Sequence, residues 1–260
     1  MENEVLFERR EQEGAAWAQI ILNRPLKGNA LTFPMLEELE RIARMIASDK
    51  DIRVVVIRGN GRFFCTGGDI EAWGSLTPND MGQKWILYGI NVFNCITSLP
   101  QPVIAAMGGH ALGGGLELAL AADLRVAVST AKFGVPEVCL GMISGWTGVR
   151  RLAEIIGVAR ARHMALLGSS ISAEQALEWG LLTAIADDAA GLDTLVTEWL
   201  ERLMANGPVA MALTKGLLTT MHQEMRQAFA SAAAHAAATE DCREGVRAFL
   251  EKRKPVFKGC

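Results

Sequence analysis

Residues Gly108–Asp123 read GGHALGGGLELALAAD, and this stretch predicts most about the chain. Five glycines crowd its first half, and one carboxylate, Glu117, follows in an apolar run typical of a helix. Glycines at 113–115 let backbone N–H groups approach a ligand, because no side chain blocks them. A buried glutamate is costly unless it is hydrogen-bonded. The pattern indicates an anion or oxyanion receptor beside a functional carboxylate; a first-turn glutamate that favours the helix dipole is the alternative.

The size and composition of the chain are those of a globular protein. It has 260 residues, 50% hydrophobic and 21% charged, with a net charge of -3. These values predict one large core with a smaller appendage and exclude disordered, collagenous and coiled-coil classes. The charge balance provides no basic field for nucleic acid, so we expect no nucleic-acid partner.

The cysteines and the amino-terminal residues indicate the compartment. Five cysteines are scattered without metal-ligand spacing, which predicts a reducing environment and no metal site. The start, MENEVLFERREQEG, is not typical of a signal or transit peptide, and no apolar run reaches the roughly 18 residues of a membrane span. We therefore expect a cytoplasmic protein without a membrane partner, although a processed organellar protein would look the same.

The first half of the chain predicts alternating strands and helices. A hairpin is expected over residues 5–22, a helix capped by Thr32, and a buried strand over Asp51–Arg58. Strands are also expected over residues 103–107 and 124–128, and Phe133–Glu137 is expected to form an irregular turn. This order predicts an α/β fold.

Two segments of loop character lie among these elements. Residues 71–94 mix tryptophans, glycines and a weakly helical pattern, which fits either a flexible segment that shapes a substrate site or an ordinary surface loop and helix. Residues 141–148 form the second expected loop.

Helices dominate the second half of the chain. They are expected over 148–156, 159–167, from a Ser172 cap to Gly180, and over 192–204, 209–234 and 239–252, with a short strand at 181–185. We place a boundary near residue 195, so that 1–195 form the core with the ligand site and 196–260 form a helical oligomerisation region.

Two glycine corners and two isolated acids could carry chemistry. Gly68 and Gly114 each follow a predicted strand, and their N–H groups could converge on one carbonyl oxygen. Glu117 and Glu137 could form a general acid/base pair. The alternative for the two glycine corners is that both are ordinary tight turns. For the two glutamates, distance along the sequence alone does not show that their side chains meet.

Other polar residues have weaker claims. His110 lies beside the glycine corner, but a lone histidine in apolar sequence is more often packed or bonded to backbone. Arg150, Arg151 and the basic residues near 252–258 could bind phosphate, but a solvated helix face is the favoured interpretation for each of them.

Three motifs together resemble the crotonase (enoyl-CoA hydratase/isomerase) superfamily. They are FCTGGDI at 64–70, ALGGGLEL at 111–118 and FGVPE at 133–137, in the order and spacing of that family. The likeness extends from Leu22 to Lys254. It implies a spiral of ββα units with a C-terminal helical region, a homotrimer or hexamer, and an acyl-CoA substrate without a separate cofactor.

The resemblance implies roles for particular residues. Gly68 and Gly114 would form the oxyanion hole for a thioester carbonyl. Members that hydrate enoyl-CoA carry two glutamates, and Glu137 follows Glu117 by 20 residues, as in those members. Glu117 would then deprotonate water for attack at Cβ, and Glu137 would deliver a proton to Cα.

The resemblance also implies substrate contacts. Backbone of the loop that contains Lys27, Asn29, Ala30 and Leu31, together with Asp69 and Ile70, would contact CoA. Phe249 and Lys252 would reach the nucleotide end from a neighbouring subunit.

One motif departs from the family pattern. Where short-chain hydratases usually read IPGAGGTQRL, this chain keeps Gly145 but has Ser144 for proline and Trp146 beside the expected acyl pocket. Trp146 either narrows the pocket, stacks on an unsaturated acyl group, or fills the core behind the loop.

These features together predict a hydratase-like lyase that adds water across the 2,3-double bond of an acyl-CoA. A double-bond isomerase is the alternative enzyme. A non-catalytic or RNA-associated member of the superfamily is the alternative of another class, but the two glutamates and the lack of a basic extension argue against it.

Overall fold

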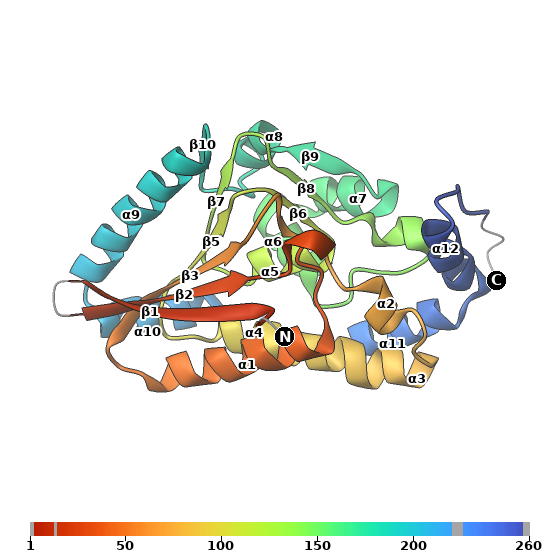
Figure 1. The fold of residues 1–260 in the computed structure, drawn as a ribbon, viewed down its shortest axis with the longest axis horizontal. Helices are drawn as coiled ribbons and strands as arrows, with labels where there is room; N and C mark the ends of the chain where they lie inside the picture. The colour runs from red at the N-terminus through yellow and green to blue at the C-terminus, as the bar shows by residue number, and fades with distance from the viewer. Residues whose placement is uncertain (1–2, 13–14, 220–225, 257–260) are drawn as a thin grey trace.

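The computed structural model describes residues 3–12, 15–219 and 226–256. Figure 1 shows the strands in the middle, with α1 running beneath them and the last helix, α12, at one end. In the part of the chain that is described, no helix is long and apolar enough to cross a membrane.

A six-stranded sheet forms the centre of the fold, in the order β1-β2-β3-β5-β7-β10. Its strands are β1 (Val5–Gln12), β2 (Ala15–Leu22), β3 (Ile52–Gly59), β5 (Val103–Met107), β7 (Leu124–Val128) and β10 (Ala184–Ala186). The β1–β2 pair is antiparallel and the other pairs are parallel. This confirms the predicted hairpin and buried strands, which carry β-branched runs because both faces are covered.

A second sheet of four short strands lies beside the first, in the order β4-β6-β8-β9. Its strands are β4 (Phe63–Cys65), β6 (His110–Leu112), β8 (Lys132–Gly134) and β9 (Ser170–Ser172). Strands β3, β5 and β7 of the large sheet are each followed by a strand of the small one and then by helical structure. This repeated ββα order confirms the predicted spiral.

Helices cover the sheets and extend the chain. They are η1 (Pro25–Lys27), α1 (Phe33–Ser48), α2 (Ile70–Trp73), α3 (Pro78–Asp80), the π-helix η2 (Met81–Ile86), α4 (Leu87–Thr97), α5 (Gly114–Leu120), η3 (Pro136–Leu140), α6 (Gly148–Ile156), α7 (Val158–Leu167), α8 (Ala173–Glu178), α9 (Ala189–Ala205), α10 (Pro208–Thr219), α11 (Arg226–Ala238) and α12 (Glu240–Leu250). The Thr32 and Ser172 hydroxyls cap α1 and α8, as predicted.

Several predicted elements differ from the observed ones. Residues 133–137 are not simply an irregular turn, because Phe133 pairs with Ala111 and Ile171 in the small sheet and η3 follows. The strands β6 and β9 were not predicted, since three residues are too few for a visible alternation. The strand expected at 181–185 occupies 184–186. Within the helix expected at 209–234, residues 220–225 lie outside the described range.

The expected boundary near residue 195 falls inside α9. This helix packs against β3, β5, β7 and β10 of the large sheet, with Leu192, Val196 and Leu200 buried. The later helices also return to the core: α11 packs against η2 and α4, and α12 packs against η3. A Cβ on Gly245 of α12 would lie 2.4 Å from the carbonyl oxygen of Leu140, so only glycine allows this approach.

Candidate active site

A cavity of about 530 Å³ opens where the predicted glycine corners meet. It lies at the ends of β4 and β6, between the start of α5, η3, the 142–146 loop and α12. Its lining is mostly apolar and includes Gly68, Gly114, Glu117 and Glu137. Segments far apart in the sequence therefore bring all four central candidates to one cavity.

The amides of Gly68 and Gly114 lie next to each other. A Cβ built on Gly114 would be 3.4 Å from the Gly68 nitrogen. Backbone hydrogen bonds on both sides of Gly68 hold its loop in place. Leu31 N–H donates to the Gly67 carbonyl and Asp69 N–H donates to the Leu31 carbonyl, each at 2.8 Å. Gly114 is the first residue of α5, so its N–H has no acceptor within that helix. The two amides can therefore serve as a pair of donors to one oxygen.

Glu117 is held at the amino terminus of another helix. Its carboxylate accepts a hydrogen bond of 2.6 Å from the N–H of Gly148, the first residue of α6, and the side chain is almost fully buried. Burial raises the pKa of Glu117, while the Gly148 amide and the Arg151 charge oppose that rise. A helix amino terminus also favours the ionised carboxylate. Glu117 is thus a buried carboxyl group that is held in a fixed position.

Glu137 has the opposite surroundings. Its Oε1 would lie 3.0 Å from a Cβ on Gly113, which places the carboxyl group against the glycine corner. Its Oε2 is buried and has no hydrogen-bond partner among the described residues. Burial and, second, the Glu117 charge raise the pKa of Glu137 to about 8. Burial thus raises the pKa of both carboxyl groups, but their hydrogen-bond surroundings differ: Glu117 is bonded to a helix amino terminus, and Glu137 Oε2 has no partner among the described residues.

Tryptophans form one wall of the cavity. Trp146 is 3% exposed, and its Nε1–H donates to the Trp85 carbonyl at 3.2 Å. Its ring leaves no space for side chains at Gly89 and Gly114, where a Cβ would lie 2.1 and 2.5 Å from indole atoms. Trp146 thus fills the core behind the loop and also lines the cavity; its effect on the width of the acyl pocket stays a prediction. Trp85 and Trp73 pack in the same way beneath Gly68.

Most of the other predicted substrate contacts reach the cavity. Lys27, Ala30, Asp69, Ile70 and Gly145 line it.

The side chains of two residues of the amino-terminal loop stabilise the fold. Asn29 is fully buried and its Nδ2 donates to carbonyls of Asn60 and Phe63, while Leu31 is buried and pairs with the Gly68 loop. Neither is among the residues that line the cavity.

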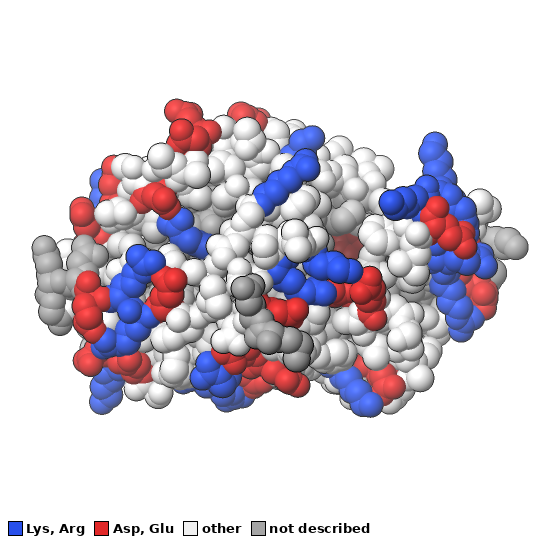
Figure 2. All heavy atoms as spheres, in the orientation of Figure 1, with Lys and Arg blue, Asp and Glu red and all other residues white. Residues whose placement is uncertain are grey.

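Phe249 lines the cavity of its own chain, because α12 packs on η3. The contact from a neighbouring subunit, which the resemblance implies, stays a prediction. Lys252 follows α12 and is not part of the lining. Figure 2 shows Lys and Arg gathered at this end of the molecule, where Arg243, Arg247 and Arg253 pair with neighbouring glutamates.

The structure also settles the weaker candidates. His110 Nδ1 accepts a hydrogen bond from Lys132 N–H, so it is bonded to backbone, as the simpler interpretation held. Arg150 forms an ion pair with Glu154. Arg151 is not a solvated residue: its guanidinium is largely buried and donates to Asn94. No group of three or more metal-ligating side chains occurs among residues that the structure describes.

Four lining residues from the 71–94 segment were not predicted from the sequence: Glu71, Trp73, Trp85 and Ile86. The tryptophans were a signal for a substrate-shaping segment, but they do not belong to one regular helix, because Trp73 ends α2 and Trp85 lies in the π-helix η2. The sequence could not reveal that they face the glycine corners.

Paired amide donors and two unlike carboxyl groups around one cavity define a class of enzyme that stabilises an oxyanion and moves protons beside it. Comparison with known proteins gives the family. The model of the enoyl-CoA hydratase/isomerase family matches residues 12–260, and the chain belongs to this family.

Several named relatives are hydratases. The chain is 37% identical over 235 residues to a probable enoyl-CoA hydratase of Bacillus subtilis, covering 89% of this chain and 91% of that one. It is 34% identical to the short-chain-enoyl-CoA hydratase of Clostridium acetobutylicum, covering 94% of each. A crystal structure of an enoyl-CoA hydratase from Mycobacterium avium matches with a TM-score of 0.86 at 28% identity, covering 98% of this chain and 99% of that one. These relatives group the chain with the hydratases, and isomerisation is the alternative within the family.

Proposed function

We propose that this chain hydrates 2-enoyl-CoA thioesters at the cavity described above. The observation that carries the proposal is the contrast between two carboxyl groups at one cavity: Glu117 is hydrogen-bonded at a helix amino terminus, whereas Glu137 has a buried oxygen without a partner. Hydration needs one base and one acid at the same moment, and the contrast supplies both.

The thioester carbonyl would accept hydrogen bonds from the N–H groups of Gly68 and Gly114. These donors draw electron density toward the oxygen, so that Cβ becomes electrophilic and the enolate that forms is stabilised. Glu117 would take a proton from water as the water oxygen bonds to Cβ. Glu137 would donate its proton to Cα as the enolate collapses. One hydrogen of the water stays on the new hydroxyl group. The other passes to Glu117 and then, through solvent, restores the proton that Glu137 gave to Cα.

The proposed steps use only these groups and water, and CoA takes part as a portion of the substrate. Lys27, Asp69 and Ile70 at the cavity, and Lys252 at the α12 end, would contact CoA. All four assignments follow the family resemblance, and Lys27, Asp69 and Ile70 also line the cavity.

We also propose that the chain forms a trimer or a hexamer through its carboxy-terminal helices. Large apolar side chains on α10 are solvent-exposed in the single chain: Val209, Leu213, Leu217 and Leu218 are 65–78% exposed. Measuring the solution mass tests this proposal, and a monomer at micromolar concentration would contradict it.

A cytoplasmic location is part of the proposal. It is supported by the free thiols of Cys65, Cys95, Cys139 and Cys242. Cell fractionation tests it.

Turnover of a panel of acyl-CoA thioesters tests the function. Wild type is expected to hydrate 2-enoyl-CoAs, whereas Glu117→Gln and Glu137→Gln lose at least about 100-fold in kcat, as is typical for a lost acid or base. Glu198→Gln, an exposed change on α9, is the control. Conversion of 3-enoyl-CoAs alone would favour the isomerase, and a wild-type rate in either glutamine variant would refute the mechanism.

A further inference from the structure

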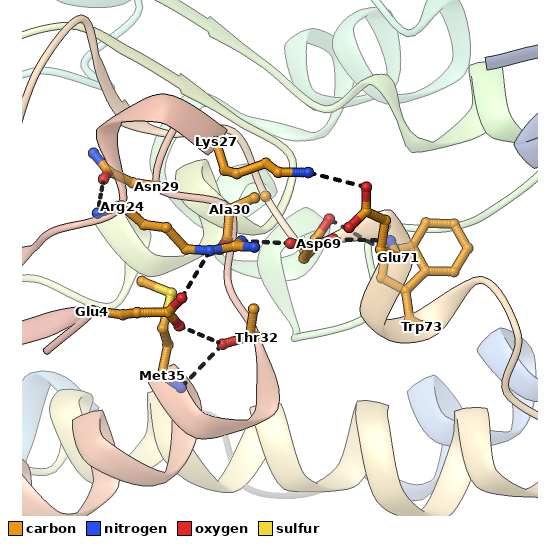
Figure 3. Close-up of polar contacts among 12 residues, drawn as sticks. Glu4, Arg24, Lys27, Asn29, Ala30, Thr32, Met35, Asp69, Glu71 and Trp73 are labelled. Atoms are coloured by element: carbon orange, nitrogen blue, oxygen red, sulfur yellow. Dashed lines mark hydrogen bonds and ion pairs between the residues drawn. The ribbon is translucent and has the colours of Figure 1, made fainter. Parts of the chain in front are cut away.

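Arg24 links the amino-terminal strand to the loop that carries Gly68. Figure 3 shows its guanidinium between Glu4 and Asp69. Its Nε pairs with Glu4 at 3.0 Å, and one terminal nitrogen donates both to Asp69 and, at 3.0 Å, to the Ala30 carbonyl. The Arg24 side chain is 18% exposed and that of Asp69 is 8% exposed. This is a largely buried charge network, in contrast to the surface ion pairs of the helices.

The contacts of Arg24 lie on both sides of the Leu31–Gly68 pairing. Ala30 precedes Leu31 and Asp69 follows Gly68, so one guanidinium holds a neighbour of each paired residue. The Gly68 carbonyl in turn accepts a hydrogen bond from the Trp73 indole at 3.3 Å. The peptide groups before and after Gly68 are therefore fixed, and this leaves the Gly68 N–H as the donor toward the cavity.

Asp69 divides its carboxylate between two tasks. One oxygen accepts from Glu71 N–H at 2.9 Å and caps α2, and the other pairs with Arg24. Without the guanidinium, a buried carboxylate would lack its counter-charge, and the loop would have to move to solvate it. The Gly68 amide would move with it, because the two residues are adjacent.

The other end of the network is anchored on rigid elements. Glu4, next to β1, also accepts a hydrogen bond of 3.2 Å from the Thr32 hydroxyl, which caps α1 through Met35 N–H. Arg24 itself is held by its backbone N–H, which donates to Asn29 Oδ1 at 2.8 Å. The guanidinium is thus fixed from the side opposite the cavity.

We propose that Arg24 is a positioning residue for the oxyanion hole, acting through Asp69 and the Ala30 carbonyl on the orientation of the Gly68 N–H. The inference rests on the proposed function, because it assumes that Gly68 donates to a thioester carbonyl. Misplacing one such donor lowers kcat by about 100-fold.

A chromophoric ligand tests the proposal without turnover. A 3-aryl-2-enoyl-CoA with an electron-donating amino group on the ring absorbs at longer wavelength when its carbonyl is polarised. Wild type is expected to shift the absorbance of the bound ligand to the red. Arg24→Met and Asp69→Asn should bind the ligand but lose most of the shift, with kcat falling about 100-fold and KM changing far less.

The variants separate positioning from folding. Asp69→Asn removes the charge pair while it keeps the side-chain size and the oxygen that caps α2. Arg58→Met is the matched control, since Arg58 is a partly buried arginine paired with Asp193 on α9; its red shift and kcat should equal those of wild type. A full red shift in both Arg24→Met and Asp69→Asn overturns the proposal for Arg24. No shift in wild type on binding overturns instead the proposed role of the oxyanion hole.

Discussion

Replacing Glu137 by glutamine should stabilise the protein at high pH while it removes activity. The carboxyl group is buried, and its Oε2 has no partner among the described residues. Its pKa in the folded protein is raised to about 8 from the ordinary value of 4.5. A raised folded pKa means that the stabilising contribution of the proton is fully present below pH 4.5 and is lost as pH rises through about 8.

The size of this effect follows from the pKa shift. Each unit corresponds to about 1.4 kcal/mol, so between pH 5 and pH 8 the wild type should lose at most roughly 4 kcal/mol of unfolding free energy from this one group. The glutamine variant carries no charge there and escapes the loss. Its unfolding free energy relative to wild type should therefore rise with pH by a few kcal/mol.

Urea unfolding at pH 5, 7 and 9, at one fixed protein concentration, measures the difference. Glu198→Gln provides the control, because this exposed glutamate should give the same difference from wild type at every pH. If the advantage of Glu137→Gln is equally large at pH 5 and pH 9, the carboxyl group is not held protonated by burial, and its assignment as the acid loses its basis.

The other predictions concern rate and specificity. In wild type, kcat/KM should fall as pH rises through about 8, where Glu137 loses its proton, and a pH-rate profile without a basic limb would count against this role. Gly148→Ala should lower kcat about 100-fold, since the added methyl group would displace the Glu117 carboxylate that the Gly148 N–H binds. Its Cβ would lie 2.1 Å from Glu117 Cγ, whereas Gly191→Ala, with its nearest neighbours at 3.5 Å, should keep the wild-type rate. Trp146→Ala should raise kcat/KM for long 2-enoyl chains relative to short ones and cost about 3–5 kcal/mol of stability; an unchanged chain-length profile would remove Trp146 from the acyl site.

The helices and strands that could be predicted best are those with a long hydrophobic pattern in the sequence. The strands of the hairpin, the Thr32-capped helix and the β-branched run of β3 span eight or more residues each, and their patterns reflect buried faces. The short strands β6 and β9 contain three residues each, and only their neighbours in space hold them extended. Tertiary pairing therefore decides these elements, and it leaves no local signal.

The site was predictable to a similar degree. The glycine corners and the lone acids could be predicted because their residue types are unusual in apolar surroundings. The structure brings them together at one cavity. The function of Asn29 could not be inferred, since its side chain bonds to carbonyls more than 30 residues away. The position of Trp146 against Gly89 and Gly114 was equally hidden, because it depends on contacts between separate elements.

In the proposed mechanism, Glu117 and Glu137 act together on a polarised enoyl thioester. Hydration of a 2-enoyl-CoA in D₂O, followed by NMR of the product, tests it most directly. Wild type is expected to form a 3-hydroxyacyl-CoA with one deuterium at Cα, on the same face as the added hydroxyl. Both glutamine variants are expected to lose this product. Recovery of only a shifted double bond, or of the same product at the same rate from Glu137→Gln, would contradict it.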